Sequence, residues 1–221
     1  KIYGVPFDVV PLAMFYSLKA FEEAGLSESD IPKTWDQFLE IARKLTKGDR
    51  FGCLFETAAG YYQTFNWYPF MWQGGGEIAT PDGKHTAFAS PATVQALKFW
   101  QDTIQQKVAP RNLLGGGGWD VVANLASGFC AMQNLGPPGV KVLRDNAKDF
   151  QYGVFPYPLP PNGQQRTVLG GWAFVANAKG KNPEEAAKFC VWAVGSMQDD
   201  CIQRVVDWSK ASGLMTARKS A

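Results

Sequence analysis

The run Thr167–Ala176 constrains the fold of this chain more than any other segment. Its β-branched and aromatic residues are typical of a buried strand, but Gly170 and Gly171 interrupt it. A glycine pair weakens a strand, so it usually marks a bulge or a close approach of the backbone to another group. Trp172 follows directly. An indole beside open backbone amides suits a flat, hydroxylated ligand; a Trp packed in the core beside a bulge explains this run equally well.

The composition indicates an ordered globular protein and argues against several kinds of partner. Of the 221 residues, 46% are hydrophobic and 19% are charged, which is enough to build a real core. The net charge is only +2, with basic and acidic residues interspersed, so we expect no nucleic-acid partner. No apolar run approaches the roughly 20 residues of a transmembrane helix. The chain opens directly on a strand-like run without an initiator Met, so we expect it to be part of a longer protein.

Strand-like and helical segments alternate along the chain, which predicts the α/β class. Thr34 with Gln37 predicts a capping box at the start of a helix, and Ser90 before Pro91 predicts another helix start. The apolar stripes that follow place Trp35 and Trp100 in helix packing. The expected strands are 2–7, 50–55, 129–134, 152–155 and 167–176, and the expected helices are 12–24, 34–45, 90–104, 120–126 and the segments after Asn182 and Ser196.

Two segments concentrate aromatic residues outside these stripes. Residues 57–76 contain seven aromatics in twelve positions: Tyr61, Tyr62, Phe65, Trp67, Tyr68, Phe70 and Trp72. A wholly buried helix would leave the interleaved amides, including Asn66, in need of partners, whereas an aromatic-lined cleft wall explains both kinds of residue. The loop 114–119 ends in Trp119 and carries four glycines, but no Lys-Ser/Thr follows, so it is no phosphate-binding loop. A mobile linker is the simpler interpretation of that loop.

The residues needed for common catalytic and metal sites are missing. His85 is the only histidine, which excludes a His-based metal cluster, and no nucleophile elbow is present. The four cysteines show no metal-binding spacing; four buried thiols are favoured over a Cys190–Cys201 bridge. Glycoside hydrolysis would need two carboxylates across a cleft, which a sequence cannot show. We therefore expect a non-enzymatic protein without metal or cofactor, whose cleft recognises a neutral polar ligand.

Four segments in this order resemble one family. They are Tyr3-Gly-Val-Pro-Phe-Asp8 through Tyr16, Pro32-Lys-Thr-Trp35-Asp-Gln-Phe38, Phe70-Met-Trp-Gln-Gly-Gly75-Gly-Glu77, and Gly170-Gly-Trp-Ala173 followed by Asn182-Pro-Glu-Glu-Ala186-Ala. Together they resemble the extracellular solute-binding proteins of sugar ABC importers, the maltose-binding-protein-like group. Ser127-Gly128 and Thr216–Ser220 also fit the pattern of that family.

The resemblance implies an α/β, periplasmic-binding-protein-like, two-lobed fold of which this chain covers mainly the second lobe. Residues 1–10 would be the first lobe-crossing strand, 11–165 the second lobe, and 166–221 the return crossing with part of the first lobe. That family is about twice as long as this chain, so most of the first lobe should precede it. The crossings near Pro6–Val10 and Thr167–Trp172 should lie side by side.

The resemblance also implies a function: capture of a sugar or oligosaccharide in an aromatic-lined interlobe cleft, and delivery to the permease subunits of an ABC importer. The location would be periplasmic or extracellular, at the membrane only through the transporter, and we expect a monomer. The implied ligand-binding residues are Asp8, Asn66, Trp67, Trp72, Trp119, Gly171 and Trp172. A binder of a non-sugar solute (polyol phosphate, polyamine or metal) and a carbohydrate-active enzyme remain as alternatives.

Overall fold

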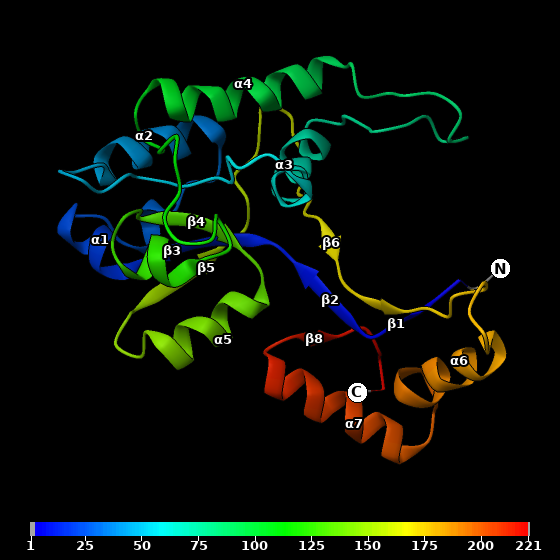
Figure 1. The fold of residues 1–221 in the computed structure, drawn as a ribbon. Helices are drawn as coiled ribbons and strands as arrows, with labels where there is room; N and C mark the ends of the chain where they lie inside the picture. The colour runs from blue at the N-terminus through cyan, green and yellow to red at the C-terminus, as the bar shows by residue number, and fades with distance from the viewer. Residues whose placement is uncertain (1–2, 221) are drawn as a thin grey trace. The chain divides into compact units, whose positions relative to one another are not determined.

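The computed structural model describes residues 3–220, and its chain divides into two compact units. The small unit combines Lys1–Pro11 with Leu169–Ala221, and the large unit is Leu12–Val168. The chain therefore leaves the small unit after β2 and returns to it at β6 (Figure 1).

The large unit is built on a three-stranded antiparallel sheet. Its central strand, β3 (Ala13–Ser17), pairs with β4 (Met132–Leu135) on one side and β5 (Tyr152–Phe155) on the other. The helix expected over 12–24 is therefore wrong in its first half. Met14 to Tyr16 are buried in succession, as in a strand that is covered on both faces, and such a run resembles a buried helix in sequence. Helix α1 (Leu18–Glu23) begins only after Ser17, whose hydroxyl accepts a hydrogen bond from the amide of Ala20.

The other helices of the large unit surround this sheet. They are α2 (Trp35–Leu45), α3 (Tyr61–Gln73), α4 (Pro91–Gln105) and α5 (Pro137–Asn146), with short turns at η1 (Glu28–Asp30) and η2 (Val122–Ala126). Both predicted helix starts are confirmed. Thr34 and Gln37 form the reciprocal capping box of α2, and Ser90 caps α4 with Pro91 in its first turn.

The core of the large unit is rich in stacked aromatic rings. Trp35 is buried, as predicted, and its ring stacks on Phe99 with 4.6 Å between the centroids. Trp100 is half-buried against the same core and stacks on Phe55 at 4.8 Å. The strand expected over 50–55 forms only isolated bridges: an antiparallel one from Arg50 to Lys47, and parallel ones from Phe51 to Cys130 and from Leu54 to Gln133.

The small unit contains two short sheets. In one, β2 (Asp8–Pro11) lies between β6 (Leu169–Gly170) and β8 (Met215–Thr216); in the other, β1 (Val5–Pro6) pairs with β7 (Ala173–Phe174). All these pairs are antiparallel, and Val10 lies opposite Gly170. The two segments predicted to lie side by side do so.

Two helices, α6 (Pro183–Cys190) and α7 (Asp199–Ser212), complete the small unit, with the short helical turn η3 (Val191–Gly195) between them. Phe189, in the last turn of α6, is exposed. Cys190 and Cys201 are buried and free, as are the other two cysteines. None of the helices described between residues 3 and 220 combines the length and apolar character needed to span a membrane.

Candidate functional site

Asp8 is the buried polar centre of the small unit. It begins β2 opposite Thr216 and is only 2% exposed. One carboxylate oxygen, Oδ1, accepts a hydrogen bond from the backbone N–H of Trp172. The other, Oδ2, is buried without a hydrogen-bond partner among the described residues. An unpaired buried acceptor costs about 1–3 kcal/mol, so a hydroxyl that reached Oδ2 would be bound favourably.

Gly171 allows the two strands to approach each other at this point. Its φ is +153°, and a Cβ there would lie 2.3 Å from the carbonyl oxygen of Asp8 and 3.2 Å from its Oδ1. No side chain fits in that space. The prediction that this glycine marks a close approach of the backbone to another group is confirmed. That group is Asp8.

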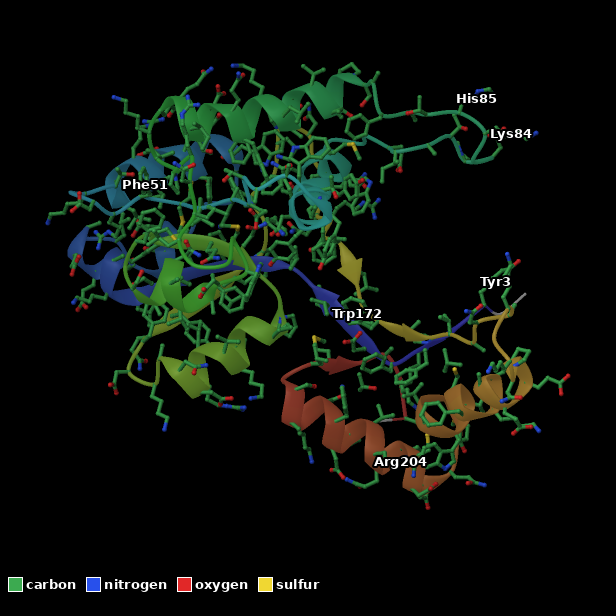
Figure 2. All side chains as sticks on the ribbon, viewed as in Figure 1. Tyr3, Phe51, Lys84, His85, Trp172 and Arg204 are labelled. Atoms are coloured by element: carbon green, nitrogen blue, oxygen red, sulfur yellow. The ribbon has the colours of Figure 1, made fainter. Side chains whose placement is uncertain are left out.

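Trp172 presents its ring at the bend between β6 and β7 (Figure 2). Its backbone is held on both sides, because its N–H donates to Asp8 and its carbonyl accepts from the N–H of Phe7 at 3.1 Å. The side chain is nevertheless 65% exposed. A ring on fixed backbone with an open face can pack on the C–H face of a ligand without ordering its own main chain.

The glycine loop of the large unit is fixed rather than a free linker. Glu56, which is buried, accepts from the N–H of Gly118 at 2.7 Å and from that of Ala58 at 2.8 Å. Asn124 donates to the carbonyl of Gly117 at 3.0 Å and accepts from the N–H of Leu114 at 3.0 Å. These bonds hold a loop whose last residue, Trp119, is 60% exposed.

Tyrosine side chains begin α3 near the same carboxylate. Tyr61 is exposed and Tyr62 is half-buried. Burial raises the pKa of Tyr62 to about 12, and the charge of Glu56 adds to the rise. The N-terminal end of α3 therefore combines polar and aromatic groups.

Trp72 lies at the opposite end of α3, at a pocket of about 530 Å³. The pocket belongs entirely to the large unit. Its lining combines one indole, two glycines, and amide and charged side chains: Trp72, Gln73, Gly74, Gly75, Glu77, Asn162, Gln164 and Arg166.

The remaining predicted site residues lie inside α3 packing. Asn66 is buried and donates to the carbonyl of Tyr62 at 2.7 Å. Trp67 is 5% exposed and packs beside Phe88. Both side chains are covered by the packing around α3, and their contact with a ligand stays a prediction. Trp72 and Trp172 belong to different units, so their position in one cleft stays a prediction.

Sequence reasoning gave Glu56 no particular role among several carboxylates. The only signal in the sequence is its position directly after the apolar run Phe51–Phe55. Its hydrogen-bond partner Gly118 is 62 residues away, a contact that no local pattern indicates. Within residues 3–220 no group of three or more His, Cys, Asp and Glu side chains gathers in a way that could hold a metal ion.

Comparisons with known proteins agree with this architecture. The family described as bacterial extracellular solute-binding protein matches residues 1–199. A probable amino-acid ABC transporter periplasmic-binding protein of Sinorhizobium fredii is 26% identical over 196 residues, which are 87% of this chain and 43% of that protein.

Two solved structures are similar over nearly the whole chain. One is an ABC transporter solute-binding protein from Thermotoga lettingae bound with α-D-tagatose (27% identity, TM-score 0.81, 98% of this chain and 54% of that chain). The other is a cyclic α-maltosyl-1,6-maltose binding protein from Arthrobacter globiformis (28% identity, TM-score 0.74, 95% and 51%). The chain thus spans about half the length of these relatives. It has the periplasmic-binding-protein-like fold, and it belongs to the bacterial extracellular solute-binding protein family.

Proposed function

We propose that this chain is the ligand-binding part of a solute-binding protein of an ABC importer, and that its solute is a sugar or oligosaccharide. The protein would act outside the cytoplasmic membrane, in the periplasm or at the cell surface, and deliver the sugar to the permease subunits. It would perform no catalysis, act as a monomer and need no cofactor. The Asp8–Gly171–Trp172 arrangement carries this proposal.

Each part of that arrangement matches one part of a sugar. The open indole of Trp172 offers an apolar face for ring C–H groups. The unpaired Oδ2 of Asp8 can accept a hydroxyl hydrogen, and the bare backbone at Gly171 lets a ligand come close. Trp119 offers a second open indole, on the large unit. The sugars named for the two solved relatives support this class of ligand.

The test is a thermal-shift screen of the purified protein against mono- and oligosaccharides, followed by isothermal titration of the best ligand. Trp172→Ala removes one apolar platform, worth on the order of 1–3 kcal/mol. The dissociation constant should therefore rise roughly ten- to a hundredfold. Trp208→Ala is the matched control, because Trp208 is an exposed indole of the same unit outside this arrangement.

Equal effects of the two substitutions would remove Trp172 from the site. The affinity for a neutral sugar should also be nearly independent of salt, since the ligand brings no charge to screen. A steep salt dependence would favour a charged solute such as a polyol phosphate. Release of shorter sugars during the titration would favour a carbohydrate-active enzyme.

A further inference from the structure

We propose that the pocket at the C-terminal end of α3 binds a small zwitterion, an amino acid or a molecule with the same pair of charged groups. The ammonium group would lie against Trp72 and Glu77, and the carboxylate against Arg166. This site is additional to the sugar site proposed above and does not depend on it.

The pocket lies far from the polar cluster at the other end of the same helix. Ten residues separate Tyr62 from Trp72, which is about 15 Å along a helix axis. Within the large unit, the C-terminal pocket is therefore separate from the Glu56 and Trp119 region. A small ligand seated in one cannot touch the other.

Two opposite charges without salt-bridge partners line the pocket. Among residues 3–220, neither Glu77 nor Arg166 lies within salt-bridge distance of an oppositely charged group. Arg166 is oriented by a hydrogen bond from Nη2 to the side-chain oxygen of Gln164 at 3.1 Å. This bond uses one of the five N–H donors of its guanidinium, so the others can bind a carboxylate.

The ammonium end is favoured by three features of the helix terminus. The carbonyl end of a helix carries partial negative charge, which attracts cations. Trp72 is half-buried against Tyr68, with 5.3 Å between the ring centroids, so its ring is held in place. A cation over an indole face is attracted by the ring quadrupole, and Glu77 adds a full negative charge.

Gln73 is an unpartnered polar side chain in the pocket lining. It is 1% exposed, and neither its side-chain oxygen nor its side-chain nitrogen has a hydrogen-bond partner among the described residues. Its backbone carbonyl accepts from the N–H of Gln164 at 3.0 Å, which fixes the loop 160–164 to the end of α3. The terminal torsion of a glutamine is soft, so its amide can turn to both donate to and accept from a polar ligand.

The experiment follows the indole N–H resonance of Trp72 by NMR, identified with Trp72→Phe, while L-alanine is added to the purified protein. N-acetyl-L-alanine and L-alanine methyl ester each remove one charge of the zwitterion, and maltose tests for a carbohydrate site. Arg166→Gln and Glu77→Gln should each weaken L-alanine binding about fivefold, the loss of one charge-assisted contact at an exposed position. Arg111→Gln and Glu28→Gln are matched controls, being exposed charges outside the pocket.

We expect L-alanine to shift the Trp72 resonance, and N-acetyl-L-alanine and L-alanine methyl ester to bind more weakly than L-alanine. Of the four charge variants, only Arg166→Gln and Glu77→Gln should lose affinity for L-alanine. No shift with L-alanine would overturn the proposal. If either analogue bound as tightly as L-alanine, the site would not require both charges of the zwitterion, and the proposal would also be overturned. A shift with maltose instead would assign Trp72 to a carbohydrate site. The titration of Trp172→Ala with a sugar tests the proposed sugar site separately.

Discussion

Gly171→Ala tests the physical basis of the arrangement around Asp8. The new Cβ would lie 2.3 Å from the carbonyl oxygen of Asp8 and 3.1 Å from its carbonyl carbon. Both are backbone atoms, so the strands must separate. A residue forced into a sparsely populated backbone region costs about 1–3 kcal/mol, and overpacking adds about 1–3 kcal/mol. We expect the free energy of unfolding to fall by roughly 2–6 kcal/mol, the sum of these two costs.

Gly25→Ala is the matched control. Gly25 also has a positive φ, +69°, but nothing lies within 4 Å of a Cβ built there. It should cost only the backbone term, about 1–2 kcal/mol for a non-glycine residue in the left-handed region. The assay is urea denaturation followed by tryptophan fluorescence. If Gly171→Ala destabilises the protein no more than Gly25→Ala, the close approach to Asp8 is not a constraint, and the account of why glycine stands beside Trp172 is refuted.

Four further outcomes are expected. Asp8→Asn should weaken sugar binding about fivefold in isothermal titration, since a charge-assisted hydrogen bond becomes a neutral one; unchanged affinity would exclude Oδ2 from the site. Glu56→Ala leaves two backbone N–H groups unpaired, including that of Gly118, and should lower the free energy of unfolding measured in urea by about 2–4 kcal/mol. A loss no larger than that of an exposed surface substitution would contradict the role of Glu56 in holding the glycine loop. Thr34→Ala removes a helix cap and should lower the same free energy by about 1 kcal/mol; no loss would mean that the capping box adds nothing. The pKa of Tyr62 is raised from 10.0 to about 12, so its contribution to stability is complete below pH 10 and is lost as the pH rises through 12. Tyr62→Phe should therefore reduce the fall in the free energy of unfolding between pH 10 and pH 12. An unchanged fall would contradict the raised pKa of Tyr62.

Local chemistry made part of the fold predictable. The capping residues Thr34 and Ser90 act within three positions of themselves, so their sequence signals and their hydrogen bonds coincide. The glycine pair beside Trp172 indicated a close approach for the same reason: only glycine avoids the clash. The glycine approaches Asp8, which is 163 residues away in the sequence. Only the family resemblance indicated that Asp8 belongs to the site.

The errors arose where tertiary context decides. A strand buried on both faces, such as β3, loses the alternation that would distinguish it from a helix, and Leu12–Tyr16 was therefore assigned to a helix. The site assignments of Trp67 and Trp72 stay predictions: the two look alike in sequence, but Trp67 lies inside the packing around α3 and Trp72 lines a pocket. Neither periodicity nor composition separates them. The fixed glycine loop depends on Glu56, a partner that no local pattern could supply.

The central claim is that a sugar ring packs on Trp172 beside Asp8. The most direct measurement is an NMR experiment that detects intermolecular nuclear Overhauser effects between the C–H protons of the bound sugar and the tryptophan ring protons, assigned with Trp172→Phe. We predict effects from one face of the sugar to the Trp172 indole. Effects to other tryptophans of a protein that binds the sugar, with none to Trp172, would contradict the account.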